Sequence, residues 1–357
     1  MAFPRARRLP LLLCALGAAA LTGEGGARAA QNDLRLLNLC PPDMTTRECS
    51  WVQRDANGEV IAGKTVPDTD GQARFRSLMS ELGFAIAPRL MTPADTLGFA
   101  GFQFSAELGV TKINPNREIG GRAYWDGIAK VDPNSRTAIR PDSYLTTVGG
   151  YVRKGMWLPL PAFEFGAGAL SIVGSRMYVL QGYAKLALQE GFHGWWLPSF
   201  AVRGGASQLL GTSEVDLTVY SLDLLASKAF SIGGTARIEP FAGWSVLFID
   251  ARSGVIDATP TCDAFASPGG TSPNAQCTAS QAGRGDDLNA NFTFPHQDII
   301  TRQRFFGGFK LKLSVVFLAA QFELGLAGSS RDSSASTGAA DRAGSQQTYS
   351  LSAGFDF

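Results

Sequence analysis

The chain has 357 residues, of which 45% are hydrophobic and 18% are charged, and its formal net charge at pH 7 is +1. A chain this close to neutral lacks the basic excess that nucleic-acid binding requires, so no nucleic-acid partner is expected. Its 41 glycines, together with a charged content below the average of soluble domains, favour a β-rich chain with tight turns.

Residues 1–29 predict a cleaved export signal. Three basic residues come first, namely Arg5, Arg7 and Arg8, and an apolar run follows over residues 9–21. The "ARA" at 27–29 suits signal peptidase, so the mature chain is expected to start near Ala30. A membrane anchor is the alternative, but the run is shorter than the roughly 20 residues that span a bilayer.

The cysteines of the exported chain predict disulfides. Cys14 lies inside the apolar run, which leaves Cys40, Cys49, Cys262 and Cys277. Four cysteines allow three pairings, of which the two short loops Cys40–Cys49 and Cys262–Cys277 are the simplest. Export leads to an oxidising compartment, where disulfides are the rule. The rival is a four-thiol metal site, which no CxxC spacing supports, so we expect neither a metal nor a cofactor.

Residues 30–97 predict a short α/β segment tied by the first disulfide. Asn57-Gly58, between β-prone runs, is typical of a hairpin. Asp70 is expected to cap a helix with one apolar face, formed by Phe75, Leu78, Met79 and Leu82. Pro88 and Pro93 are expected to end it.

From about residue 98 the hydrophobic period changes to two. In "FAGFQFSAELGV", Phe102, Phe104, Ala106, Leu108 and Val110 alternate with Gln103, Ser105, Glu107 and Gly109. After the export signal no apolar run is long enough for a membrane helix, so a membrane protein of this sequence must be a closed barrel. The repeated alternation predicts an all-β fold, a transmembrane up-and-down antiparallel β-barrel of about ten strands (range about 8–12) over residues 98–357. We expect strands near 98–113, 144–156, 162–174, 177–189, 199–210, 214–230, 235–250, 298–313, 316–328 and 347–357.

The connections between these strands differ in length according to their order. Those at 114–143, 251–297 and 329–346 are long, and all are odd-numbered, so they lie at the same end of the barrel. The even-numbered connections are short. Long loops at one end and short turns at the other are typical of transmembrane barrels. Three tryptophans, Trp157, Trp195 and Trp196, lie in or beside the short turns, where an aromatic belt meets the membrane interface.

The last residues, "TYSLSAGFDF", form a strand that ends on an aromatic residue. Its outward set is expected to be Tyr349, Leu351, Phe355 and Phe357, with Ser350, Ser352 and Gly354 turned inward. The strand must pair with the first strand, near 102–110, because lipid tolerates no open sheet edge. It resembles the C-terminal strand of bacterial outer-membrane β-barrel proteins, a broad class within which no specific family is identified. The resemblance implies location in the bacterial outer membrane, with membrane lipid and the barrel-assembly machinery as partners, the terminal strand being the assembly signal.

The polar faces of the strands predict the lining of the lumen. A Lys or Arg on the lipid face costs about 2–4 kcal/mol at midplane, which fixes the orientation. The expected lumen-lining residues are Glu107, Arg153, Glu164, Lys185, Arg203, Glu239, Arg302, Arg304, Lys310, Lys312 and Glu323. The face of Arg153 stays open, because its neighbours define the phase of that strand poorly. Two outcomes compete: ion pairs that fill a narrow barrel, or a small anion-favouring path beside the basic residues of the eighth strand.

Two histidines restrict enzymatic chemistry. His193 lies in a short turn, and His296 lies with Asp298 near the rim of the long-loop end. Outer-membrane proteases of the omptin type place a His and acidic residues on that rim, but no further acidic cluster accompanies this pair. We therefore expect no catalytic residues and no enzyme.

Three functions remain, in order of expectation. The first is a narrow channel or transporter for small solutes. The second is a surface structural or adhesion barrel that binds partners through its long loops. The third is an omptin-like or lipid-modifying barrel enzyme. Residues 30–97 either lie in the periplasm or plug the lumen.

Overall fold

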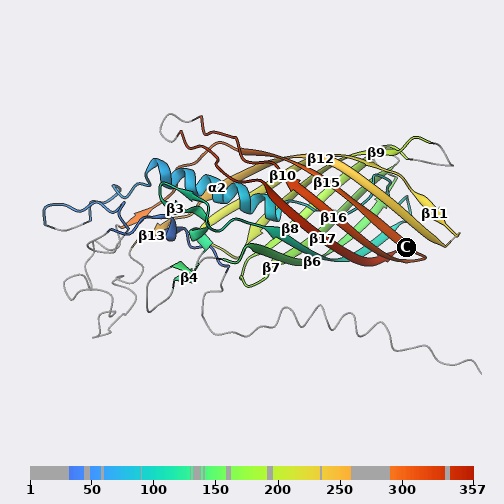
Figure 1. Ribbon diagram of the computed structural model, residues 1–357, viewed down its shortest axis with the longest axis horizontal. Helices are drawn as coiled ribbons and strands as arrows, with labels where there is room; N and C mark the ends of the chain where they lie inside the picture. Colours follow the sequence, from blue (N-terminus) through green and yellow to red (C-terminus); the bar gives the residue numbers. More distant parts are fainter. Residues whose placement is uncertain are drawn as a thin grey trace, which may run out of the picture.

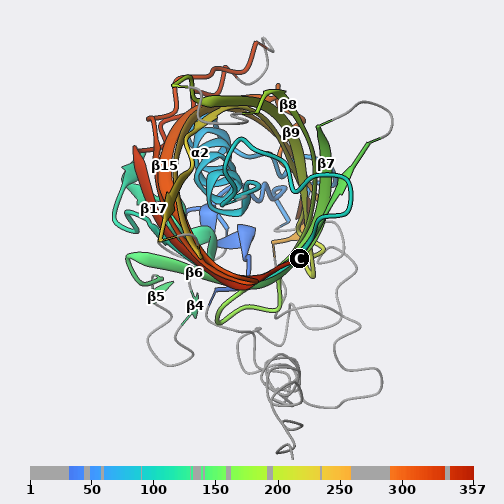
Figure 2. The same cartoon turned by 90° about the vertical axis from the view of Figure 1, so that its right-hand side faces the viewer.

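A computed structural model shows a closed antiparallel barrel of ten strands. It describes residues 32–43, 49–57, 60–89, 91–128, 130–131, 138–139, 141–157, 162–190, 196–233, 235–258, 290–333 and 338–357. The barrel strands are β1 (Phe102–Lys112), β6 (Tyr144–Met156), β7 (Phe163–Ile172), β8 (Tyr178–Gln189), β9 (Ser199–Leu210), β10 (Val215–Ser227), β12 (Ala236–Ser253), β15 (Ile300–Leu313), β16 (Val316–Gly325) and β17 (Gln346–Asp356). Each strand pairs with its neighbours in sequence, and β17 pairs with β1 (Figures 1 and 2).

The closing pair of strands confirms the prediction for the C-terminal strand. Ten residues of β1 pair with β17, from Gln103 opposite Asp356 to Lys112 opposite Gln347. In β17 the burial alternates with a period of two, so that Tyr349, Leu351 and Phe355 are exposed on the outside. A closed barrel leaves no backbone edge unpaired, which is the condition for a strand in lipid.

The predicted strand order and count are confirmed, with small changes at the ends. β1 begins at Phe102, because residues 98–101 form a turn in which Gly98 takes a positive φ of 74°. β12 runs to Ser253, beyond the expected end at 250, and a short strand β11 (Phe230–Ile232) pairs with its start.

The barrel has two different ends. The connections after β1, β12 and β16 are long, and all lie at the end that we call the loop end. They contain the short hairpins β2 (Glu118–Ile119) with β3 (Arg122–Ala123), β4 (Lys130–Val131) with β5 (Ala138–Ile139), and β13 (Ile256–Asp257) with β14 (Asn291–Phe292), and a 3-10 helix, η2 (Tyr124–Ile128). The other end, the turn end, carries Phe102 and the C-terminal Phe357, whose backbones hydrogen-bond to each other.

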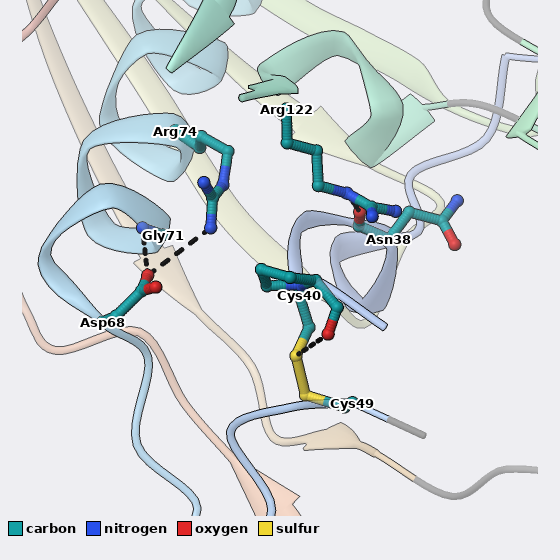
Figure 3. Close-up of a disulfide and its surroundings, with 8 residues drawn as sticks. Asn38, Cys40, Cys49, Asp68, Gly71, Arg74 and Arg122 are labelled. Carbon is teal, nitrogen blue, oxygen red and sulfur yellow. Dashed lines mark hydrogen bonds and ion pairs between the residues drawn. A yellow bond between two sulfur atoms is a disulfide. The ribbon is translucent and has the colours of Figure 1, made fainter. Parts of the chain in front are cut away.

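The N-terminal segment contains a 3-10 helix, η1 (Leu36–Leu39), and one long helix, α2 (Thr69–Ile86). α2 is N-capped by Asp68, whose carboxylate accepts a hydrogen bond from the Gly71 amide (Figure 3). The prediction that Asp70 is the cap was therefore wrong: Asp68 has the extended backbone that a cap requires, while Asp70 already lies in the first turn. The helix ends before Pro88, since a proline disfavours helical geometry at the residue that precedes it.

Helix α2 lies within the ring of strands when the barrel is viewed along its axis (Figure 2). Its residues from Gly71 to Ile86 are all buried, polar and apolar alike. Among the described residues, no helix has both the length and the apolar character needed to cross a bilayer.

The first predicted disulfide, Cys40–Cys49, is confirmed (Figure 3). Cys262 and Cys277 lie outside the described residues, as do the export signal, His193 and Trp195. At the predicted hairpin an isolated antiparallel bridge joins Arg54 to Val60. The disulfide belongs to an apolar core at the loop end, where the Trp51 ring packs edge-on against Phe292 and Phe294.

Candidate functional site: the occupied lumen and the loop end

The N-terminal half of α2 is fixed to the long connections. Arg74 Nη1 donates to the Ile119 carbonyl at 2.9 Å, and Arg76 Nη1 donates to the Asp298 carbonyl at 2.8 Å. Both arginines are buried. The helix therefore starts at the loop end and points into the barrel.

A buried carboxylate, that of Glu81, joins the middle of α2 to two long connections. It accepts hydrogen bonds from the Tyr124 hydroxyl, from Trp125 Nε1 at 2.6 Å and from the Gly344 amide at 2.8 Å. Burial raises the pKa of this carboxyl, while the three hydrogen bonds and the nearby Arg302 act in the opposite direction. We call this group of contacts the Glu81 latch.

Arg302, on β15, supports the Glu81 latch from the barrel wall. Its Nη1 donates to the Ser80 carbonyl at 3.2 Å and to Gln346 Oε1 at 2.6 Å, and its Nη2 donates to the Gly344 carbonyl at 2.8 Å. One guanidinium thus donates hydrogen bonds to the helix, to β17 and to a long connection. Its planar group holds several N–H donors in fixed directions, which allows it to bond to all three at once.

The C-terminal end of α2 and Pro88, which follows it, meet donors of the wall. Gln181 Nε2, on β8, donates to the Ile86 carbonyl at 2.7 Å, and Arg304 Nη2, on β15, donates to the Pro88 carbonyl at 2.6 Å. The last carbonyls of a helix lack intrahelical partners and carry partial negative charge, so an amide and a cation are favourable there.

Residues 91–97 then continue through the lumen toward the turn end. Lys185 Nζ donates to the Pro93 carbonyl at 3.1 Å and to the Asp95 carbonyl at 2.8 Å. The Ala94 amide donates to Ser227 Oγ at 2.9 Å, at the last residue of β10. Further on, the Thr96 amide donates to Glu190 at 2.9 Å, next to a short turn. α2 and the chain that follows it therefore occupy the lumen from one end toward the other.

The wall of the lumen is a network of buried ion pairs. Arg153 pairs with Glu107 at 3.3 Å, Lys185 with Glu164 at 3.2 Å, and Arg304 with Glu323 at 3.3 Å. These six side chains are at most 6% exposed. Buried charges are tolerated only when they are paired and hydrogen-bonded, and here both conditions are met.

The remaining residues predicted to line the lumen also have partners. Arg203 pairs with Asp223 at 2.7 Å, and Glu239 pairs with Arg237. Lys310 and Lys312 both pair with Asp356, at 2.6 Å and 3.1 Å. Lys312 is half-buried and the others are buried.

Among the described residues, Asp223, Asp356 and Arg89 are charged groups of the lumen that sequence reasoning missed. Asp223 is inward-facing on β10, and alternation in "VDLTVYSLDLLAS" would have shown this. Asp356 lies on the inward side of the terminal strand, next to an outward Phe355. Arg89 follows the helix and gave no periodic signal. It lines a small cavity of about 10 Å³ with Glu107, which is room for about one water molecule.

The other sequence-predicted residues lie on the outside of the barrel. Trp157 and Trp196 are 63% and 83% exposed, beside short turns at the turn end. Phe357 is 63% exposed there as well. His296 is exposed, with its Nε2 4.0 Å from the Asp250 carboxylate. The carboxylate of Asp298 instead accepts hydrogen bonds from Ser333.

A closed antiparallel barrel with an apolar exterior, a polar interior and long connections at one end is typical of β-barrel proteins that span a membrane. The chain has the fold of a transmembrane β-barrel. No protein-family model matches it, and no curated protein matches it.

Solved structures of the same class resemble the chain at low identity. Ail, the attachment invasion locus protein of Yersinia pestis, is 10% identical with a TM-score of 0.23, and the match covers 72% of this chain and 99% of Ail. Neisserial surface protein A is 10% identical with a TM-score of 0.25, covering 71% of this chain and 95% of that protein. At such scores the likeness concerns the barrel fold alone, and the strand pairings of this chain define its own barrel.

Proposed function

We propose that the chain is a closed outer-membrane barrel that acts as a surface structural or adhesion protein. The observation that carries the proposal is the occupied lumen. α2 and residues 91–97 lie inside the strands, and the backbone carbonyls of Ile86, Pro88, Pro93 and Asp95 are bonded to wall side chains.

Solute passage would require this segment to move. Displacement would leave Arg304 and Lys185 without their bonds to the segment, and would expose the apolar side chains of α2 to the lumen. Each buried hydrogen-bonding group that loses its partner costs about 1–3 kcal/mol. Several such losses at once favour the occupied state over an open channel.

The surface that remains for function is the loop end. There the N-terminal segment with its disulfide packs against two of the long connections, and Glu81 accepts a hydrogen bond from Gly344 of the third. Ile61 and Val66 are exposed apolar side chains of this surface, 38% and 55% exposed. In transmembrane barrels the long loops face the outside of the cell, so this surface is available to partners.

Single-channel recording in planar bilayers tests the closed state. The protein is first shown to be folded by its heat-dependent shift in gel mobility. We expect no stable conductance steps from folded protein. Reproducible steps from the wild type would contradict the proposal and favour a narrow channel.

An adhesion assay tests the surface role. Cells that produce the protein are compared with cells that do not, on surfaces coated with fibronectin or collagen. We expect greater adhesion by the producing cells, and a loss of that gain in the variant Ile61→Ser with Val66→Ser. Equal adhesion of all three cell types would contradict an adhesive role.

A further inference from the structure

The start of the described chain is anchored at the loop end of the barrel. The Asn32 amide donates to the Gly174 carbonyl at 2.9 Å, and its side-chain Nδ2 donates to the Val173 carbonyl at 2.8 Å. Asp33 Oδ1 accepts from the Arg176 amide at 2.7 Å. These partners belong to the connection between β7 and β8, which lies at the loop end.

The residues that follow stay at the same end. The Arg35 amide donates to the Gly127 carbonyl at 2.7 Å, and Arg122 Nε donates to the Asn38 carbonyl at 2.7 Å. The Leu36 amide donates to Glu214 Oε2 at 2.5 Å, in the connection between β9 and β10. Three connections of the loop end, namely β1–β6, β7–β8 and β9–β10, thus hold this stretch before α2 begins.

From there the chain runs through the barrel only once. α2 enters from the loop end, residues 91–97 approach the turn end, and β1 starts there at Phe102 (Figure 1). Asn32 and Phe102 are therefore at opposite ends of the barrel. Since β1 must begin on the periplasmic side, Asn32 lies on the other side.

We propose that the barrel carries its own N-terminal segment across the outer membrane and displays it on the cell surface. The lumen is the path, and α2 with the residues that follow it to 97 is the part of the segment that remains in it. This activity goes beyond adhesion: any peptide placed directly before Asn32 becomes a surface peptide.

The packing of the segment explains why it stays outside. Two of its large apolar residues pack at the loop end: Trp51 packs on Phe292 and Phe294, and Phe75 stacks on Phe294 with ring centroids 4.5 Å apart. A segment on the periplasmic side would leave these side chains in water. Burial of large apolar side chains is favourable, so the surface position of these residues is favoured.

Epitope insertion on intact cells tests the proposal. The same short epitope is inserted at three sites of the full chain: between Gln31 and Asn32, after Gly338 in the connection before β17, and between Ser314 and Val315 in the turn between β15 and β16. Antibody binding is measured by flow cytometry before and after the outer membrane is permeabilised. The heat-dependent gel shift of each variant shows that the barrel has folded.

We expect the epitope before Asn32 to bind antibody on intact cells as fully as the epitope after Gly338, while the Ser314–Val315 epitope binds only after permeabilisation. An epitope before Asn32 that requires permeabilisation, with the Gly338 epitope accessible, would overturn self-display alone. If the Gly338 epitope also required permeabilisation, the orientation of the barrel would be wrong, and the surface role proposed above would fail with it.

Discussion

Removal of the Arg304 guanidinium should destabilise the barrel through two separate losses. Its Nη1 lies 3.3 Å from a Glu323 carboxylate oxygen, and its Nη2 donates to the Pro88 carbonyl at 2.6 Å. The Arg304 and Glu323 side chains are each 1% exposed, so solvent cannot replace either contact. The variant Arg304→Met keeps a side chain of comparable length while it removes the charge and the donors.

The expected loss follows from these contacts. A buried ion pair that loses one partner costs about 3–5 kcal/mol, because the other charge stays buried and uncompensated. The unsatisfied Pro88 carbonyl adds about 1–3 kcal/mol. Arg304 Nη2 also lies 3.6 Å from an Asp223 carboxylate oxygen, but Asp223 keeps its closer pair with Arg203 at 2.7 Å, so this third contact is left out of the minimum. We therefore expect Arg304→Met to lower the free energy of unfolding by at least about 3 kcal/mol.

Urea unfolding in lipid vesicles, followed by tryptophan fluorescence, measures this quantity. Arg252→Met is the matched control, because Arg252 pairs with Asp250 at 3.1 Å but its side chain is 63% exposed. An exposed pair contributes about 0–1 kcal/mol. The double variant Arg304→Met with Glu323→Gln should recover part of the loss, since no unpaired buried charge remains. Equal losses for Arg304→Met and Arg252→Met would refute the buried-network account.

Three further predictions concern the latch, the disulfide and barrel closure. Because the pKa of Glu81 is raised in the folded state, its contribution to stability is present below the unfolded pKa and is lost as pH rises through the folded pKa. The protease resistance of the N-terminal segment should therefore decline over that window, and a decline of the same size in Glu81→Gln would exclude this carboxyl as its source. Replacing both Cys40 and Cys49 with Ala opens a short loop and should lower the stability of the N-terminal segment by about 2–3 kcal/mol. Added protease should then cleave the segment faster while the barrel stays intact. Cleavage at the wild-type rate would show that the disulfide is dispensable. A Cβ at Gly354 would collide with the facing backbone of β1, whereas a Cβ at Gly204 meets nothing within 4 Å. Gly354→Ala should therefore lower the yield of barrel that shows the heat-dependent gel shift, and Gly204→Ala should not. Equal yields would contradict the pairing of β17 with β1.

The barrel could be predicted from the sequence because each strand carries its own signal. Alternation with a period of two specifies which residues face lipid, and a polar residue between two apolar ones specifies the lumen. The pairing of β17 with β1 followed from the requirement that a sheet in lipid has no open edge. These rules involve only neighbours in sequence or a general property of the bilayer.

The position of α2 could not be predicted in this way. Its apolar face predicted an amphipathic helix, but it did not show what surrounds the polar residues, such as Arg76, Ser80 and Glu81. In the structure these polar residues are buried, because the wall and the long connections supply polar partners for them. An amphipathic pattern cannot distinguish water from a polar lumen, so the periplasmic and plug positions were equally compatible with it.

Amide hydrogen exchange of residues 69–97 in the folded, membrane-inserted protein tests the occupied lumen most directly. In the structure the amides of Ala94, Thr96 and Leu97 donate to side chains of the wall, and α2 is enclosed by strands and long connections. We predict that these amides exchange as slowly as those of the barrel strands. Exchange of residues 87–97 at the rate of an unstructured peptide would show that the segment does not fill the lumen.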